Sequence, residues 1–156
     1  MKDKKEIIIP VTFDPSLIRR IDLVVPGKPV AKQRPKVVTR GGFARAYTPK
    51  PTVDYENLVR HTYKKEYGSF KLDGPIEADI TGIFPIPKST SKKQKALMIN
   101  NDIKHTKKPD CDNVTKSVLD ALNSYAYDDD SQICDLRVRK RYGEEPKVII
   151  KLEKER

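Results

Sequence analysis

The sequence predicts an α+β fold in which helices pack on a mixed β-sheet within a single domain. Its 156 residues are the length of one ordinary domain. Segments in which apolar residues alternate are interspersed with segments of helical period, roughly in the order strand, hairpin, helix, strand, two helices, hairpin. We expect residues 1–20 to be an N-terminal extension and residues 21–156 to form the domain.

The first half of the domain is predicted to contain a strand, a hairpin and a helix. Residues 21–25 are predicted to form the first strand, which Pro26-Gly27 ends. Residues 37–48 read as two short strands around Gly41-Gly42, because glycine tolerates the positive φ of a tight turn. Residues 52–67 carry a partial helical stripe that Gly68 can close.

The second half contains the clearest periodicities. Residues 76–84 alternate as a strand, and residues 89–100 fit a short basic helix. Residues 113–125 place nearly all their apolar side chains on one side of a helix and the polar ones on the other. Residues 131–142 and 147–152 alternate again, and we expect them to pair as a closing hairpin.

Composition excludes several classes of protein. No apolar run approaches the roughly 18 residues of a membrane helix, and the apolar run 7–9 is too short for a secretory signal. Cys111 and Cys134 provide neither a disulfide framework nor a zinc site. We therefore expect a reduced, cytoplasmic protein that is not embedded in a membrane.

The whole chain has a net charge of +10, and its positive charge is concentrated in the N-terminal part. Residues 26–53 contain no acidic side chain. Their basic side chains are Lys28, Lys32, Arg34, Lys36, Arg40, Arg45 and Lys50. A basic ribbon of this kind can lie against a phosphate backbone. The alternative is a mobile surface hairpin with solvated charges.

Two acidic clusters flank the predicted helix 113–125. Asp110 and Asp112 lie two apart in an extended segment, so they share a face. Lys116 follows Asp112 by one helical turn. The second cluster is 128–130, at the start of the next strand. A strand running back along the helix, or the partner chain of a dimer, could bring the two clusters together.

Clustered carboxylates repel one another unless a cation lies between them. Oxygen ligands without histidine suit Mg²⁺ or Mn²⁺. The structural alternative is that Asp112 caps the helix and residues 128–130 form a solvated turn.

These motifs resemble a known family. Lys-Pro-Asp-Cys-Asp-Asn-Val-Thr-Lys-Ser-Val-Leu-Asp-Ala-Leu at 108–122, followed by Asp-Asp-Ser-Gln at 129–132, is similar to the RusA-type Holliday junction resolvases of bacteria and their prophages. Gly-Lys-Pro at 27–29 and Lys-Gln-Arg-Pro at 32–35 also resemble a frequent pattern near the N-terminus of this family. The resemblance covers about residues 21–153.

The resemblance implies a site and an activity. The catalytic residues would be Asp110, Asp112, Lys116 and Asp130, and the metal ligands Asp110, Asp112, Asp129 and Asp130. The family acts as a homodimer on four-way DNA junctions in recombination and repair, using Mg²⁺, with Mn²⁺ as a substitute, to make paired symmetric nicks. The residues 28–50 named above would bind the junction arms.

Two other functions remain open from the sequence. One is a catalytically silent DNA-binding protein that keeps the basic segment. The other is a metal-dependent nuclease that acts on flaps or duplexes rather than on junctions. Carboxylates and Lys116 together favour phosphodiester hydrolysis, because carboxylates can hold a cation and a lysine can stabilise a developing negative charge.

Overall fold

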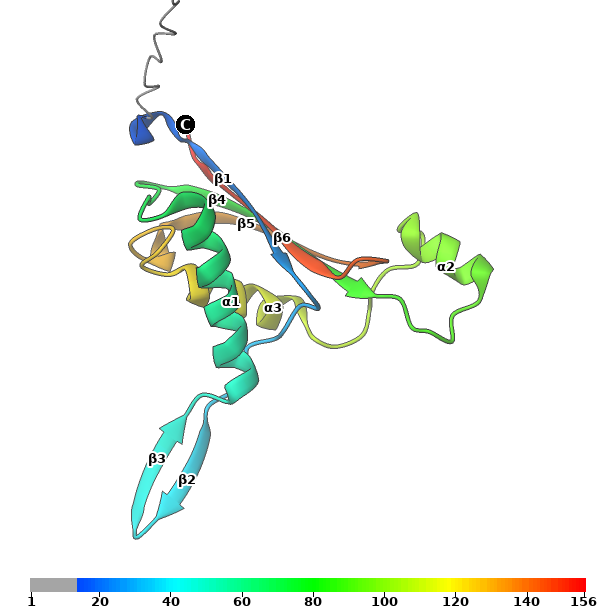
Figure 1. The fold of residues 1–156 in the computed structure, drawn as a ribbon, viewed down its shortest axis with the longest axis horizontal. Coiled ribbons are helices and arrows are strands. Elements are labelled where there is room, and N and C mark those ends of the chain that lie inside the picture. The colour runs from blue at the N-terminus through cyan, green and yellow to red at the C-terminus, as the bar shows by residue number, and fades with distance from the viewer. Residues whose placement is uncertain (1–13) are drawn as a thin grey trace, which may run out of the picture.

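A computed structural model describes residues 14–156, and within them it shows the mixed sheet, the separate hairpin and the three helices that the sequence predicts (Figure 1). The expected extension 1–20 lies largely outside the described residues, although β1 already begins at Arg20. The strands are β1 (Arg20–Pro26), β2 (Lys36–Arg40), β3 (Phe43–Tyr47), β4 (Ile76–Pro85), β5 (Ile133–Gly143) and β6 (Lys147–Lys154). The helices are α1 (Lys50–Tyr67), α2 (Lys92–Ile99) and α3 (Cys111–Leu122), with short 3₁₀ turns η1 (Pro15–Leu17) and η2 (Asp130–Gln132).

The main sheet has the strand order β1-β6-β4-β5. β4 pairs in parallel with β5 and antiparallel with β6, and β6 pairs antiparallel with β1. The predicted closing hairpin is therefore wrong, because β4 lies between the two strands that were expected to pair. Three residues, 144–146, join β5 to β6, and an extended tripeptide spans the roughly 10 Å between alternate strands.

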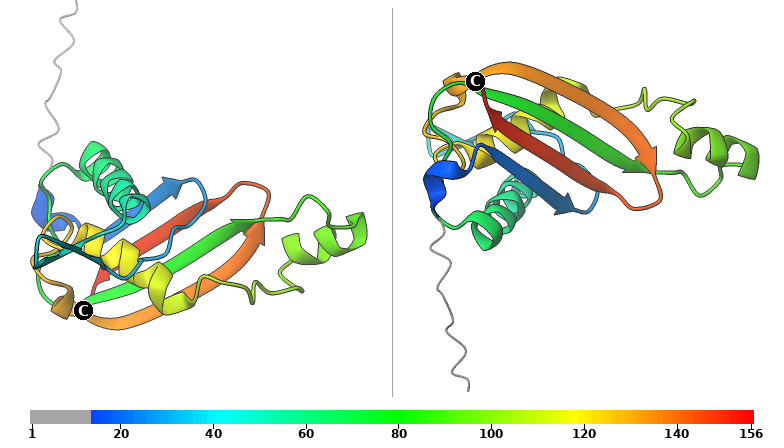
Figure 2. Two further views of the ribbon diagram at one scale, coloured as in Figure 1. Left: turned by 90° about the horizontal axis from the view of Figure 1, so that it is seen from below. Right: turned by 90° about the horizontal axis from the view of Figure 1, so that it is seen from above.

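One face of the sheet carries the hydrophobic core. α1 and α3 lie side by side against this face, and the opposite face is open (Figure 2). Alternate residues of β4 are buried on this face of the sheet: Ile76, Ala78, Ile80, Gly82 and Phe84. Val59 and Tyr63 of α1 and Val118 and Leu122 of α3 complete this layer. The alternation in the sequence thus correctly identifies the inner face.

The open face is polar. Arg137, Arg139 and Arg141 of β5 point to it, as their phase in the strand predicts. Arg139 donates to both carboxylate oxygens of Asp79 on β4, at 2.8 and 3.0 Å. This arginine is therefore engaged in a cross-strand ion pair within the sheet.

Two parts of the chain project away from this body. The β2–β3 hairpin extends beyond the N-terminal end of α1, and every residue of both strands is exposed (Figure 1). The segment that carries α2 extends beyond the ends of β4 and β5, and none of the residues of α2 is buried. Among the described residues, no helix has the length and apolar character needed to cross a bilayer.

Helix α3 begins and ends earlier than the sequence predicts. Asn123 leaves the helical geometry and Ser124 has a φ of 68°. Tyr125, which fits the apolar phase of the helix, therefore lies in a turn instead. The chain then doubles back, and the Tyr127 hydroxyl donates to the Leu119 carbonyl at 2.7 Å. This reversal determines where the second acidic cluster lies.

Candidate active site

A groove of about 340 Å³ runs between α3 and the edge strand β5. Its lining residues are Cys111, Asp112, Thr115, Lys116, Leu119, Asp120, Asp130, Leu136 and Val138. Both predicted acidic clusters thus contribute a carboxylate to one groove, and the predicted lysine lies between them along α3. Leu136 is 45% exposed, so the groove has an apolar wall that is open to solvent.

The helical repeat places three charged side chains of α3 in the groove. Asp112, Lys116 and Asp120 follow one another at intervals of four residues, which is about one turn. The opposite side of α3, including Val114 and Val118, is buried against the sheet and α1. The packing of this apolar side fixes the direction in which the charged side points.

A set of hydrogen bonds holds Asp130 beside the C-terminal end of α3. The Asn123 side chain, at the C-cap of α3, accepts from the Asp130 backbone N–H at 3.1 Å. Gln132 accepts from the backbone N–H groups of Asp128 and Asp129 and donates to the carbonyls of Leu72 and Gly74. Gln132 therefore joins the acidic turn to the segment that leads into β4.

Asp110 lies at the other end of the helix. It is the N-cap of α3, is exposed, and does not line the groove. α3 has 12 residues, so about 18 Å separates its two ends. Across residues 14–156, no three Asp, Glu, His or Cys side chains come close enough to share one ion. The single cage of Asp110, Asp112 and Asp130 stays a prediction.

The other two acidic residues of the turn have partners of their own. Asp129 forms a capping box with Gln132, and its carboxylate also accepts from the Ser131 hydroxyl at 2.5 Å. Asp128 pairs with Lys71 at 2.9 Å. The Asp129 carboxylate thus stabilises its own turn in this structure, whereas we predict it as a metal ligand.

Asp120 lines the groove but is not among the site residues that the sequence motifs predict. Its carboxylate lies 3.0 Å from the ammonium of Lys32, which also donates to Glu56 of α1. Burial alone would lower the pKa of Lys32, but the hydrogen bonds and charges of Glu56 and Asp120 outweigh it and raise the pKa. The signal in the sequence is the four-residue spacing after Lys116, which places Asp120 on the same face of the helix.

Six of the seven predicted DNA-binding residues are exposed, and Lys32 is the exception. Arg34, Lys36, Arg40 and Arg45 lie on or beside the projecting hairpin. Lys28 follows β1, and Lys50 pairs with Asp54 at the start of α1. The backbone N–H of Lys32 donates to the Asn113 carbonyl at 3.0 Å. Lys32 thus ties the root of the hairpin to α3 rather than facing solvent.

The segment before α3 is held by β5 and by an aromatic cluster. The Lys140 ammonium donates to the carbonyls of Lys107 and Pro109 at 2.7 and 2.9 Å. The His105 ring is buried and stacks on Phe84, with 4.0 Å between ring centroids. Burial lowers the pKa of His105, and the nearby charge of Lys140 lowers it further. These contacts position the chain that delivers Asp110 to the N-terminus of α3.

A comparison with protein families shows which family has this sequence pattern. The profile described as Endodeoxyribonuclease RusA matches residues 26–153. The chain belongs to the RusA family. The match spans the hairpin, α3 with its groove, and all but the last residue of β6. Membership places the chain among the endodeoxyribonucleases, as the motifs of α3 and the acidic turn predict.

A curated relative is similar to this chain over most of the length of both proteins. The uncharacterized protein YqaN of Bacillus subtilis (strain 168) is 37% identical over 132 residues, covering 83% of this chain and 93% of the relative. The similarity therefore covers nearly the whole of YqaN.

The chemistry of the groove fits the divalent ion that RusA-family nucleases use. The charged groups of the groove that can bind a metal ion are carboxylates, and Lys116 contributes an ammonium group. Proteins usually bind Mg²⁺ through one or two carboxylates together with water and substrate phosphate. Asp112, Asp120 and Asp130 are thus donors of a suitable kind along the groove.

Proposed function

We propose that this protein is a Mg²⁺-dependent, structure-selective endonuclease that resolves four-way DNA junctions by paired symmetric nicks. It would act as a cytoplasmic homodimer in DNA recombination and repair, with Mn²⁺ able to replace Mg²⁺. The observation that carries the proposal is the groove in which Asp112, Lys116 and Asp130 lie together. Family membership supplies the reaction class, and the groove supplies residues able to perform it.

Each site residue that the resemblance implies has a role in this proposal. Asp110, Asp112 and Asp130 would hold the divalent ion, which supplies an activated water and neutralises phosphate charge when it is bound. Lys116, which is exposed on α3, stabilises the negative charge that develops on the phosphate oxygens. Asp129 would support the ion-binding turn, and the basic residues of the hairpin would bind DNA arms; we leave Lys32 out of this set because two carboxylates engage it.

A homodimer offers a way to bring the separated carboxylates together. Asp110 and Asp130 lie at opposite ends of α3 in one chain. If a two-fold axis relates two α3 helices in antiparallel order, Asp130 of one subunit lies beside the N-terminal end of α3 of the other. The exposed side chain of Leu136 beside the groove gives such an interface an apolar component. We therefore propose that each site combines residues of both subunits.

Comparing three substrates tests the activity. We expect the protein with Mg²⁺ to cut a four-way junction by paired nicks, and to cut a flap and a linear duplex much more slowly. Asp110→Asn abolishes cutting in this proposal and leaves junction binding intact. Asp128→Asn is the matched control, because that exposed carboxylate pairs with Lys71. Binding without cutting by the wild type would indicate a silent DNA-binding protein, and equal cutting of all substrates a general nuclease.

Mixed dimers test the shared site. In a dimer of one Asp110→Asn chain and one Asp130→Asn chain, sites built from both subunits leave one site fully intact. Such a mixture nicks one strand of the junction, although each variant alone is inactive. If each site belonged to one chain, both sites of the mixed dimer would be damaged and no nick would form.

A further inference from the structure

The β2–β3 hairpin has two chemically different faces. Strand pairing places Lys36 opposite Tyr47, Val38 opposite Arg45, and Arg40 opposite Phe43. Residues directly opposite one another, and residues two apart in a strand, share a face. We call these six residues the basic–aromatic face. The other face carries only uncharged side chains, namely Val37, Thr39, Ala44 and Ala46.

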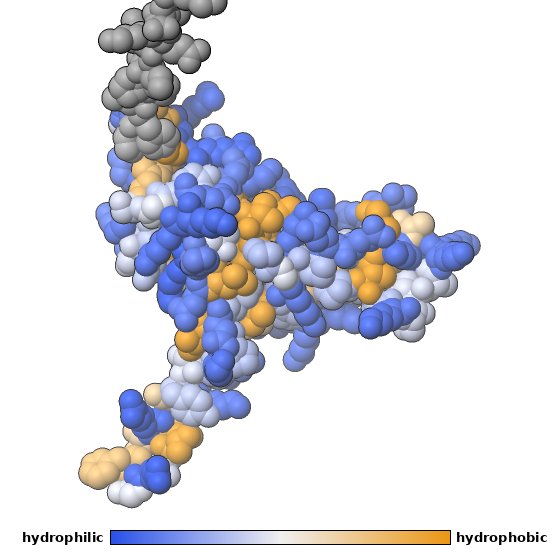
Figure 3. All heavy atoms as spheres, in the orientation of Figure 1, coloured by the Kyte–Doolittle hydropathy of each residue, from blue (hydrophilic) through white to orange (hydrophobic). Residues whose placement is uncertain are grey.

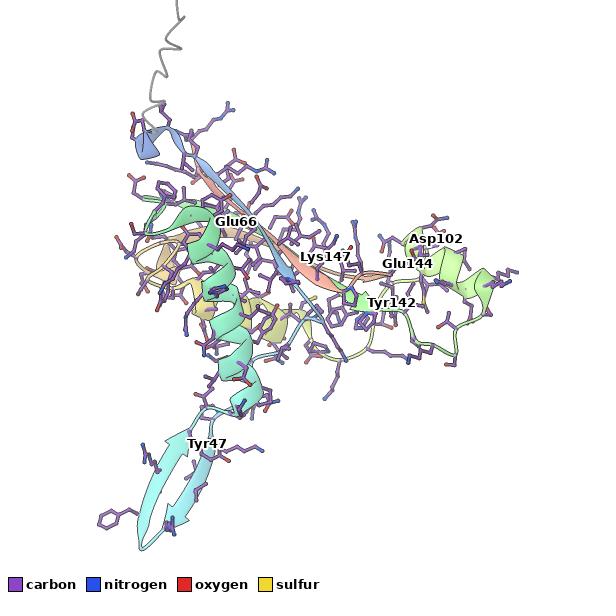
Figure 4. The ribbon with its side chains drawn as sticks, in the orientation of Figure 1. Tyr47, Glu66, Asp102, Tyr142, Glu144 and Lys147 are labelled. Carbon is purple, nitrogen blue, oxygen red and sulfur yellow. The ribbon has the colours of Figure 1, made fainter. Side chains whose placement is uncertain are left out.

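The aromatic side chains of the basic–aromatic face are open to solvent. Phe43, next to the turn at the tip, is 82% exposed. Tyr47, at the root of the hairpin, is 46% exposed (Figure 4). Apolar and basic side chains alternate over the surface of the projecting arm (Figure 3). Within residues 14–156, the core does not cover this tip. A ligand with both negative charge and flat apolar surface matches this face.

The chemistry of the face selects among nucleic-acid structures. Basic side chains attract the phosphates of any DNA. Aromatic side chains add affinity when they can stack on the face of an unpaired base, which a fully paired duplex does not present along its length. Single-stranded DNA presents such bases, and a branch point presents them where its base pairs open. The combination of Phe43 with Arg40 and Arg45 therefore favours unpaired nucleotides over intact duplex.

We infer that the basic–aromatic face of the hairpin binds unpaired nucleotides of branched DNA, with Phe43 stacking on an exposed base. The inference rests on the proposed function insofar as its ligand is DNA. The roots of the hairpin are fixed to the body: the Lys32 backbone donates to Asn113 of α3, and the Gln33 backbone donates to the Thr52 hydroxyl of α1. The arm thus presents Phe43 at a set direction from the groove.

Tryptophan substitution gives a direct measurement, because the sequence contains no Trp. Phe43→Trp places a reporter on the basic–aromatic face. Thr39→Trp places a matched reporter one residue pair from Phe43, on the opposite face of the same hairpin. Each variant is titrated, with Ca²⁺ in place of Mg²⁺, with a four-way junction, a single-stranded oligothymidine and a linear duplex.

The inference predicts that single-stranded and junction DNA quench the Phe43→Trp reporter and shield it from iodide, whereas the Thr39→Trp reporter stays accessible. Phe43→Ala lowers single-strand affinity by at least about fivefold and leaves duplex affinity unchanged, and Phe43→Tyr restores it. Equal responses of the two reporters, or no response, overturn the inference. The inference is also overturned if raising the protein concentration without DNA shields the Phe43→Trp reporter from iodide, because a second copy of the chain would then cover the tip.

The outcomes separate this inference from the nuclease proposal. If Mg²⁺ supports junction cutting but the Phe43→Trp reporter does not respond, only the inference fails. If DNA shields the reporter but nothing is cut, only the nuclease proposal fails. If the protein neither binds nor cuts DNA, both fail. The reporters lie on an exposed arm outside the core, so we expect the variants to fold as the wild type does. Circular dichroism of the variants checks this.

Discussion

The Lys32 ammonium lies 3.0 Å from the Asp120 carboxylate and joins a groove residue of α3 to the segment that leads into the hairpin. The same ammonium donates to the carboxylate of Glu56, a residue that is only 8% exposed. Two elements with different proposed tasks, the DNA-binding arm and the catalytic helix, therefore share one half-buried cation.

Replacing Lys32 by methionine should lower the free energy of unfolding by about 3 kcal/mol, because Asp120 would lose its paired cation and Glu56 would keep only Arg60, at 3.6 Å. Urea unfolding measures the change. Lys50→Met is the control, since its exposed pair with Asp54 is worth about 0.5 kcal/mol. Equal effects of the two substitutions would contradict the importance of the buried network.

Gln132→Ala should destabilise the acidic turn. It removes the acceptor of two backbone N–H groups and the donor to two carbonyls, so we expect a loss of about 1–3 kcal/mol in unfolding free energy. Junction cutting should fall as well, because Asp130 lies in the same turn. Gln132→Glu keeps the acceptor and loses the donor, and its effect should be intermediate. A fully active, fully stable Gln132→Ala variant would show that the turn is held by other contacts.

The stability of the protein should fall as the pH drops below about 6.5, in part because of His105. Burial, followed by the charges of Lys140, Lys107 and Lys28, lowers the pKa of His105 in the folded protein. The unfolded chain therefore takes up this proton first, which favours unfolding. His105→Phe should lose less stability than the wild type between about pH 7.5 and pH 5 in thermal unfolding. His61→Gln is the control on an exposed surface, and an identical pH dependence of wild type and His105→Phe would refute the assignment.

DNA binding should weaken steeply with salt. Each phosphate that a basic side chain neutralises adds about −0.9 to the slope of log affinity against log salt. The double change of Arg40 and Arg45 to Gln should therefore reduce the slope for duplex DNA by about 1.8. Fluorescence anisotropy across a salt series measures it. Lys71→Gln, outside the predicted DNA-binding segment, should leave the slope unchanged, and an unaltered slope in the double variant would remove the hairpin from the interface.

The sequence predicts local structure better than the contacts between distant segments. The apolar side of α3 is clear from its periodicity, yet the helix stops at Asn123, where the backbone turns away although Tyr125 keeps the apolar phase. Strand alternation identifies the inner face of β5 but not its neighbour, because pairing depends on which strand is buried in the middle of the sheet. Local sequence cannot reveal that Lys32 meets Asp120, since the contact forms only when residues 26–35 cross α3.

The position of β6 has a consequence for how the sheet can assemble. β6 is the last strand of the sheet along the chain, yet it lies between β1 and β4 and forms hydrogen bonds with both. During synthesis, β1 therefore cannot pair with β6 until more than a hundred intervening residues have emerged from the ribosome. Chains truncated before residue 147 would expose the apolar edge of an unfinished sheet to other nascent chains.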